Sequence, residues 1–178
     1  MSRQNWDDVL YPSFMGAVRG AYYGVISQDF MDEECFNIAQ RAVAAFKFPK
    51  ISTDYTVFYA KWETVTIEGE EQEVLVEVTE DDPDGIPHAY FNNELNYAEI
   101  EIILAWMLVY WAQKQLSNAD NFEDMYTDAN IKTYSRANAV DKNLKMLDQY
   151  REYARELENR YSRVNTSALP SLGDINNE

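Results

Sequence analysis

The feature that most constrains the fold is an unbroken apolar run from Ile102 to Ala112. Its eleven residues are too few for a membrane span, which needs roughly 20, so we expect no membrane association. The run lies in a predicted helix over residues 97–116, where Asn96 and Glu99 resemble a capping box. Apolar side chains surround that helix almost completely, which predicts burial on all sides. The rest of so short a chain offers little to cover it, so neighbouring subunits are expected to help.

A second helix is predicted over residues 32–46, with Asp32 as its N-cap and an apolar stripe at three- and four-residue spacing. A longer amphipathic helix is predicted over residues 138–161. Asp141 with Lys145, and Glu156 with Arg160, are oppositely charged pairs four residues apart on its outer side. The apolar positions of the long helix are Val140, Leu144, Leu147, Tyr150, Ala154, Leu157 and Tyr161.

Two segments rich in β-branched and aromatic residues, 55–67 and 73–79, predict an antiparallel hairpin. A lone hairpin is marginally stable in water, so it must pack on the helices or on a neighbouring subunit. The predicted fold class is therefore mainly α: a small helical bundle with a long C-terminal helix and one inserted antiparallel β-hairpin. One domain would cover residues 1–163, with an N-terminal arm over 1–30, followed by an extended tail over 164–178.

Charge is unevenly distributed along a chain whose net charge is −16. Residues 63–84 carry ten acidic and no basic side chains, whereas residues 138–163 carry six basic and five acidic ones. The acidic excess argues against sequence-specific nucleic-acid binding, which needs clustered Lys and Arg. A block of like charge is commonly a solvated face. Its functional interpretation is a surface that faces a channel or a basic neighbour.

Residues for catalysis or metal binding are scarce. Cys35 is the only cysteine, which excludes a disulfide within the chain and fits a reducing cytoplasm. His88 is the only histidine, has no nucleophile at a recognisable spacing and is expected at the surface or an interface. The acidic segment Glu80–Gly85 resembles half of a calcium loop, but Phe91 stands where a bidentate Glu is required, so an acidic turn is expected instead. We therefore expect neither an enzyme nor a cofactor or metal site.

Four segments carry a resemblance to a known family. They are FKFPK, FNNEL before the apolar helix, TYSRANA, and NRYSR at the end of the long helix, namely Phe46–Lys50, Phe91–Leu95, Thr133–Ala139 and Asn159–Arg163. In this order they resemble the head–tail connector proteins of the tailed-phage neck, and particularly the ring proteins of crAss-like phages. The resemblance covers about residues 30–163 and includes no catalytic motif. The N-terminal 30 residues have no counterpart in it.

The resemblance implies a structural virion protein of the phage neck, made in the host cytoplasm. Copies would form a homo-oligomeric ring, by family analogy a dodecamer, between the portal protein and a stopper or tail protein. The ring would line the tunnel for passing genomic DNA without sequence-specific binding. The acidic residues expected to face that tunnel are Glu68, Glu70, Glu71, Glu73 and Glu77. The residues expected to dock into the portal are Tyr161, Arg163, Leu169, Pro170, Leu172 and Ile175.

Two other functions are compatible with parts of the sequence. An acidic DNA mimic that inhibits a host nuclease or repressor would share the strong negative charge and the lack of an active site. The mixed charge of residues 138–161 speaks against it. A small hydrolase with carboxylate catalysis would need a convergent pair, but Glu99 and Glu101 are two residues apart on a helix and point in different directions.

Overall fold

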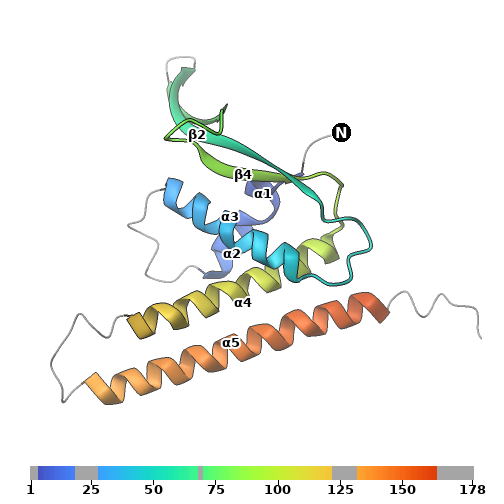
Figure 1. Cartoon of the computed structure of the whole chain (residues 1–178), viewed down its shortest axis with the longest axis vertical. Coiled ribbons are helices and arrows are strands. Elements are labelled where there is room, and N and C mark those ends of the chain that lie inside the picture. The colour runs from blue at the N-terminus through green and yellow to red at the C-terminus, as the bar shows by residue number, and fades with distance from the viewer. Residues whose placement is uncertain (1–3, 19–27, 68–69, 122–131, 164–178) are drawn as a thin grey trace, which may run out of the picture.

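The computed structural model describes residues 4–18, 28–67, 70–121 and 132–163, and Figure 1 shows them as three layers. A sheet forms one layer, three helices pack beneath it, and an antiparallel pair of long helices closes the other side. The strands are β1 Gln4–Asn5, β2 Tyr55–Ile67, β3 Glu70–Val78 and β4 Ile86–Phe91. The helices are α1 Trp6–Val9, α2 Tyr11–Val18, α3 Gln28–Ala45, α4 Tyr97–Asn121 and α5 Lys132–Arg163.

The predicted mainly-α bundle with one hairpin is wrong, because the hairpin belongs to a four-stranded antiparallel sheet in the order β1-β4-β2-β3. The hairpin of β2 and β3 is present, but β2 also pairs with β4 along its other edge, from Tyr55↔Phe91 to Ala60↔Ile86. The alternation of side chains that predicts a strand is hard to recognise in β4, because the strand has only six residues and Pro87 is one of them. A two-residue strand such as β1 carries no periodicity at all.

Residues 4–18, expected to belong to an arm, form part of the core. Trp6 is fully buried and packs its ring near those of Phe36, Tyr55 and Phe91, at centroid distances of 5.8, 4.7 and 5.5 Å. Leu10 is buried completely as well. A buried aromatic cluster of this size contributes several kcal/mol to folding, so the N-terminal segment holds the sheet on the helices.

The three predicted helices are present with different ends. Helix α3 begins at Gln28, so Asp32 lies inside it and is not the N-cap; its carboxylate instead accepts a hydrogen bond from Trp62 Nε1 at 2.8 Å. Helix α4 begins at Tyr97 as predicted, and α5 is longer than predicted at both ends. The ion pairs predicted along α5 are confirmed, with Lys145 Nζ 2.7 Å from Asp141 Oδ2 and Arg160 bonded to Glu156.

Helix α4 is the centre of the molecule, between α3 and α5 (Figure 1). Ile102, Ile103 and Met107 are almost completely buried. Burial on all sides was nevertheless an overestimate, because Trp106 and Trp111 are only partly buried. Trp106 Nε1 donates to Glu158 Oε1 at 3.1 Å, so part of the helix is covered by the polar edge of α5.

Candidate assembly surfaces

The hairpin of β2 and β3 extends beyond the rest of the sheet. Strand β4 begins at Ile86, opposite Ala60, so residues 61–67 pair only with β3. Figure 1 shows this part of the hairpin standing clear of the helical layers. Among the described elements, β3 packs extensively against β2 alone. Within the described residues, α3 contacts the base of the ribbon through the hydrogen bond from Trp62 to Asp32, and no helix packs extensively against β3.

The ribbon has two chemically different faces, because residues alternate along a strand and cross-strand partners share a face. Glu71 and Glu73 lie opposite Thr66 and Thr64 on one face. Glu77, opposite Ala60, belongs to the same face. All three of these carboxylates are exposed. Glu70 is the first residue of β3, and Glu68 lies outside the described residues.

The opposite face of the ribbon is mixed. Its apolar side chains are Val74, Val76 and Val78 of β3, which are partly buried, and Val65 of β2, which is 38% exposed. Lys61, Glu63 and Gln72 lie on the same face, because they pair with Val76, Val74 and Val65. A two-stranded ribbon is only marginally stable in water by itself. This ribbon presents exposed carboxylates on one face and a row of valines with polar neighbours on the other.

The acidic turn after β3 is held by its own hydrogen bonds. The N–H of Asp82 donates to the Thr79 carbonyl, and that of Gly85 donates to the Asp82 carbonyl, both at 3.0 Å. The N–H of Asp84 donates to Asp82 Oδ1 at 3.0 Å, which lowers the pKa of the Asp82 carboxyl, and Lys61 Nζ adds a contact of 3.3 Å. A side chain at Gly85 would lie 2.9 Å from Val78 Cγ2. Asp82 thus organises the turn.

No cluster of three or more His, Cys, Asp or Glu with metal-binding geometry occurs in the part of the chain that the structure describes. The carboxylates of Glu80, Asp81 and Asp84 project outward from the turn and are exposed. These carboxylates make the turn between β3 and β4 strongly acidic. We call residues 80–84 the acidic turn.

The end of α5 is fixed to the core through Glu99. The predicted capping box is confirmed: Asn96 N–H donates to Glu99 Oε2 at 3.2 Å and Glu99 N–H donates to Asn96 Oδ1 at 3.0 Å. The other oxygen of this fully buried carboxylate accepts the N–H groups of Lys50 and Ile51, at 3.2 and 3.0 Å, and the Tyr161 hydroxyl. Burial alone would raise the pKa of Glu99, but these hydrogen bonds outweigh it and hold the pKa below its ordinary value.

Tyr161, predicted to contact the portal, is therefore engaged within its own chain. Its ring packs against Phe46 at 5.9 Å between centroids, and Lys50 Nζ lies 4.2 Å from the ring centre. Burial, followed by the hydrogen bond to Glu99, raises the pKa of its hydroxyl. Arg163, the last residue of α5, is exposed. The other predicted portal contacts, Leu169, Pro170, Leu172 and Ile175, lie outside the described residues.

His88 is fully buried, so its predicted place at the surface or an interface is wrong. Its Nδ1 lies 2.9 Å from Asp7 Oδ1, and its ring stacks on Phe58 at 5.6 Å. The pair joins β4 to α1 across 81 positions of sequence, a separation that no local pattern reveals. Cys35 is also buried, and desolvation, followed by the nearby Asp32 carboxylate, raises the pKa of its thiol to about 12. Such a thiol is protonated at neutral pH and is a poor nucleophile.

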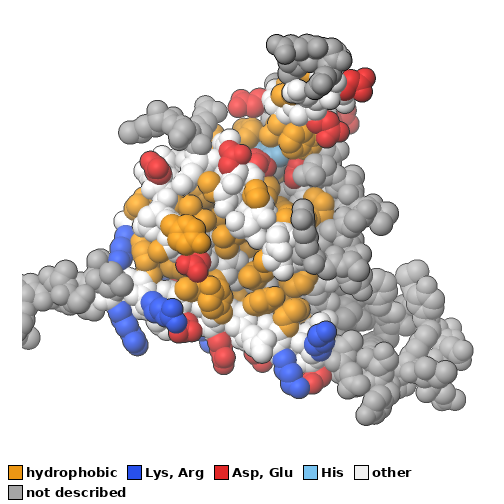
Figure 2. Space-filling view, turned by 180° about the vertical axis from the view of Figure 1, so that it is seen from behind, with side chains coloured by type: hydrophobic (Ala, Val, Ile, Leu, Met, Phe, Trp, Pro, Cys, Tyr) orange, Lys and Arg blue, Asp and Glu red, His pale blue; other side chains and the backbone are white. Residues whose placement is uncertain are grey.

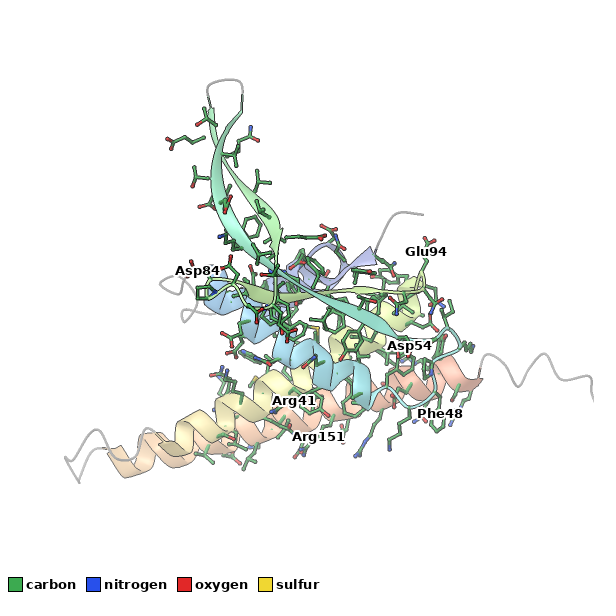
Figure 3. All side chains as sticks on the ribbon, turned by 45° about the horizontal axis from the view of Figure 1, so that its top comes forward. Arg41, Phe48, Asp54, Asp84, Glu94 and Arg151 are labelled. Carbon is green, nitrogen blue, oxygen red and sulfur yellow. The ribbon has the colours of Figure 1, made fainter. Side chains whose placement is uncertain are left out.

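A groove of about 790 Å³ lies between α3, α4 and α5. Three basic side chains line it, one from each helix: Arg41, Lys114 and Arg151, with Glu34 as the acidic residue among the lining groups. Figure 3 shows Arg41 and Arg151 near one another on the helical layers. Nothing in the sequence patterns indicated this groove, because its residues come from three separate segments.

Comparisons with protein-family models, curated proteins and solved structures found no match to this chain. Among the helices that the structure describes, none combines the length and apolar character that a membrane span requires.

Proposed function

We propose that this protein is a ring-forming structural subunit of the tailed-phage neck, a connector that joins the portal to a stopper or tail protein. The observation that carries the proposal is the two-faced hairpin. The face with the row of valines and with the polar side chains of Glu63 and Gln72, where Val65 is 38% exposed, suits packing against a neighbouring copy. Its carboxylate face, with Glu71 and Glu73, suits a channel that DNA must pass without adhering.

The placement of the segments that resemble the connector family supports this assignment. Lys50 is the last residue of the segment FKFPK, Leu95 is the last residue of FNNEL, and Tyr161 lies in NRYSR. The Glu99 carboxylate accepts hydrogen bonds from the Lys50 N–H and the Tyr161 hydroxyl. The Leu95 N–H donates to Gln4 Oε1 at 2.9 Å, and Gln4 Nε2 donates to the Leu95 carbonyl at 3.2 Å. Three of the four segments, which lie far apart in the sequence, thus converge at one end of the molecule. The fourth, Thr133–Ala139, lies at the start of α5, at the opposite end of that helix from Tyr161.

That end also has the character of a docking surface. Phe48, between Lys47 and Lys50, is 65% exposed, and Tyr97 at the start of α4 is 82% exposed. Exposed aromatic rings on a rigid base are typical anchors of protein interfaces. We assign this end, together with the tail that follows Arg163, to portal binding.

Native mass spectrometry of the full chain, alone and mixed with the portal ring of its phage, tests the proposal. A stoichiometric ring or a portal complex is the expected result. A protein that stays monomeric in both samples would overturn the connector assignment. In that case, capture of a basic host protein would favour the acidic DNA mimic.

A double substitution of Phe48→Ala and Tyr97→Ala tests the docking end separately. Both side chains are exposed, so the free energy of unfolding should change by less than about 0.5 kcal/mol. Affinity for the portal should fall at least about tenfold, as expected for exposed aromatic anchors. The matched control is Leu144→Ala with Tyr153→Ala, at exposed positions of α5. If both double variants bind the portal equally well, the docking end is assigned wrongly.

A further inference from the structure

The charges of this protein are distributed unevenly in space as well as in sequence. From Ile51 to Gln113 the chain has fourteen acidic residues, and Lys61 is its only basic one. Figure 2 shows Lys and Arg side chains toward the helical end, among Asp and Glu side chains, whereas the hairpin end displays Asp and Glu. The acidic end of one copy is therefore complementary to a second copy only where basic side chains gather locally.

The groove between α3, α4 and α5 concentrates the positive charge. Lys114 forms an ion pair with Glu34, so the net positive charge of the groove comes from Arg41 and Arg151. Arg151 reaches Asp148 only at 3.8 Å, an exposed contact of little energetic weight. Arg41 makes no ion pair with any residue that the structure describes. Among the described residues of this protein of charge −16, the two guanidinium groups thus have no strong carboxylate partner.

The acidic turn has the complementary properties. The carboxylates of Glu80, Asp81 and Asp84 are exposed, and the hydrogen bonds around Asp82 fix the backbone that carries them, so little backbone entropy would be lost on binding. Figure 3 shows Asp84 at the sheet, well separated from Arg41 and Arg151 on the helical layers. One molecule therefore does not satisfy its own groove with its own turn.

We propose that the acidic turn of one copy docks into the cationic groove of the next copy. This inference rests on the proposed ring, and it names the contact that builds it. A turn that binds a different surface of its neighbour makes a heterologous interface, and such interfaces close into rings when the rotation permits. Carboxylates of the hairpin face, such as Glu71 and Glu73, are not used in this contact and stay available to line the tunnel.

Charge reversal on each side tests the contact. The groove variant is Arg41→Glu with Arg151→Glu, and the turn variant is Asp81→Lys with Asp84→Lys. Each variant alone should associate at least about tenfold more weakly than the wild-type chain. A 1:1 mixture should regain association, because each reversed surface then meets a reversed partner and each native surface meets a native one. Sedimentation velocity at low and high salt measures both effects, and association of the wild type should weaken at high salt.

The matched controls change net charge equally at other exposed sites. For the groove the control is Lys142→Glu with Arg155→Glu on α5. For the turn it is Asp54→Lys with Glu94→Lys, which Figure 3 shows at the other end of the sheet from Asp84. Recovery in the mixture of groove and turn variants, and not in mixtures of controls, establishes the contact.

The outcomes separate this inference from the proposed function. If the wild type forms rings and neither the groove variant nor the turn variant weakens them, the docking contact is wrong and the connector assignment stands. If controls weaken association as much as the designed variants do, only net charge matters and the contact is again wrong. If the wild type forms no assembly at any salt concentration, alone or with the portal, both proposals fail.

Discussion

The two ends of the molecule use carboxylates in opposite ways. At the end that bears Phe48 and Tyr97, Glu99 is fully buried and receives hydrogen bonds from three backbone N–H groups and one tyrosine. On the hairpin, Glu71 and Glu73 are exposed, and no described helix packs extensively against their strand. The net charge of −16 therefore has no single role: the Glu99 carboxylate organises the fold, whereas those of Glu71 and Glu73 are exposed to solvent.

The largest effect should come from removing the buried carboxylate. In Glu99→Ala, the N–H groups of Lys50 and Ile51 and the Tyr161 hydroxyl lose their acceptor inside the protein. Unsatisfied buried donors cost about 1–3 kcal/mol each, less where water can enter, so we expect a loss of about 3 kcal/mol in the free energy of unfolding. Urea denaturation measures it. A loss below that of the exposed control Glu152→Ala would contradict the structural role.

Acidification should remove the same contribution gradually. The folded-state pKa of Glu99 lies below its ordinary value of 4.5. The stabilisation is therefore complete well above pH 4.5 and is lost as pH falls through the lower, folded-state pKa. The stability difference between the wild type and Glu99→Gln should accordingly narrow below that pH. Denaturation midpoints of both proteins between pH 7 and pH 3 test this. If the difference between the two midpoints does not change with pH, the ionised carboxylate of Glu99 is not the stabilising form.

Two tyrosines of α5 provide a matched comparison of buried and exposed hydrogen bonds. Tyr161 donates to buried Glu99, and Tyr153 donates to Glu101 at 3.1 Å on the surface. Tyr161→Phe should cost about 1 kcal/mol, because it removes the hydroxyl and keeps the ring contact with Phe46. Tyr153→Phe should cost less than about 0.5 kcal/mol. Equal losses in the free energy of unfolding for the two variants would mean that burial does not determine the strength of these hydrogen bonds.

The smallest effect on stability is expected at the hairpin. Glu71→Gln with Glu73→Gln should change the free energy of unfolding by less than about 0.5 kcal/mol, since both side chains are exposed. Neutralising Glu70 and Glu77 as well should slow genome ejection, because DNA would adhere to the tunnel wall. Ejection from phage that carry the fourfold variant can be followed by DNA release. Unchanged kinetics would argue against a tunnel-facing hairpin.

Features specified by neighbouring residues were predictable from the sequence. The Asn96–Glu99 capping box and the i,i+4 ion pairs of α5 depend on residues three and four positions apart, and they are present. The β2–β3 hairpin follows from two strand-forming segments and a short connection. Local propensity and periodicity therefore account for the long helices and for this ribbon.

Features specified by distant residues were not predictable. Strand β4 is defined by pairing with β2 and carries a proline at its second position. Asp32 looked like a helix cap, but a tertiary contact with Trp62 uses its carboxylate. Arg41 and Arg151 come together only when α3 and α5 pack around α4, so the groove had no sequence signal.

Electron cryomicroscopy of the protein bound to the portal ring distinguishes a closed ring from isolated copies. We expect a closed ring of this chain in which the carboxylate face of each β2–β3 hairpin borders the channel and the end bearing Phe48 and Tyr97 contacts the portal. Single copies scattered on the portal, or hairpins that point outward from a ring, would contradict it.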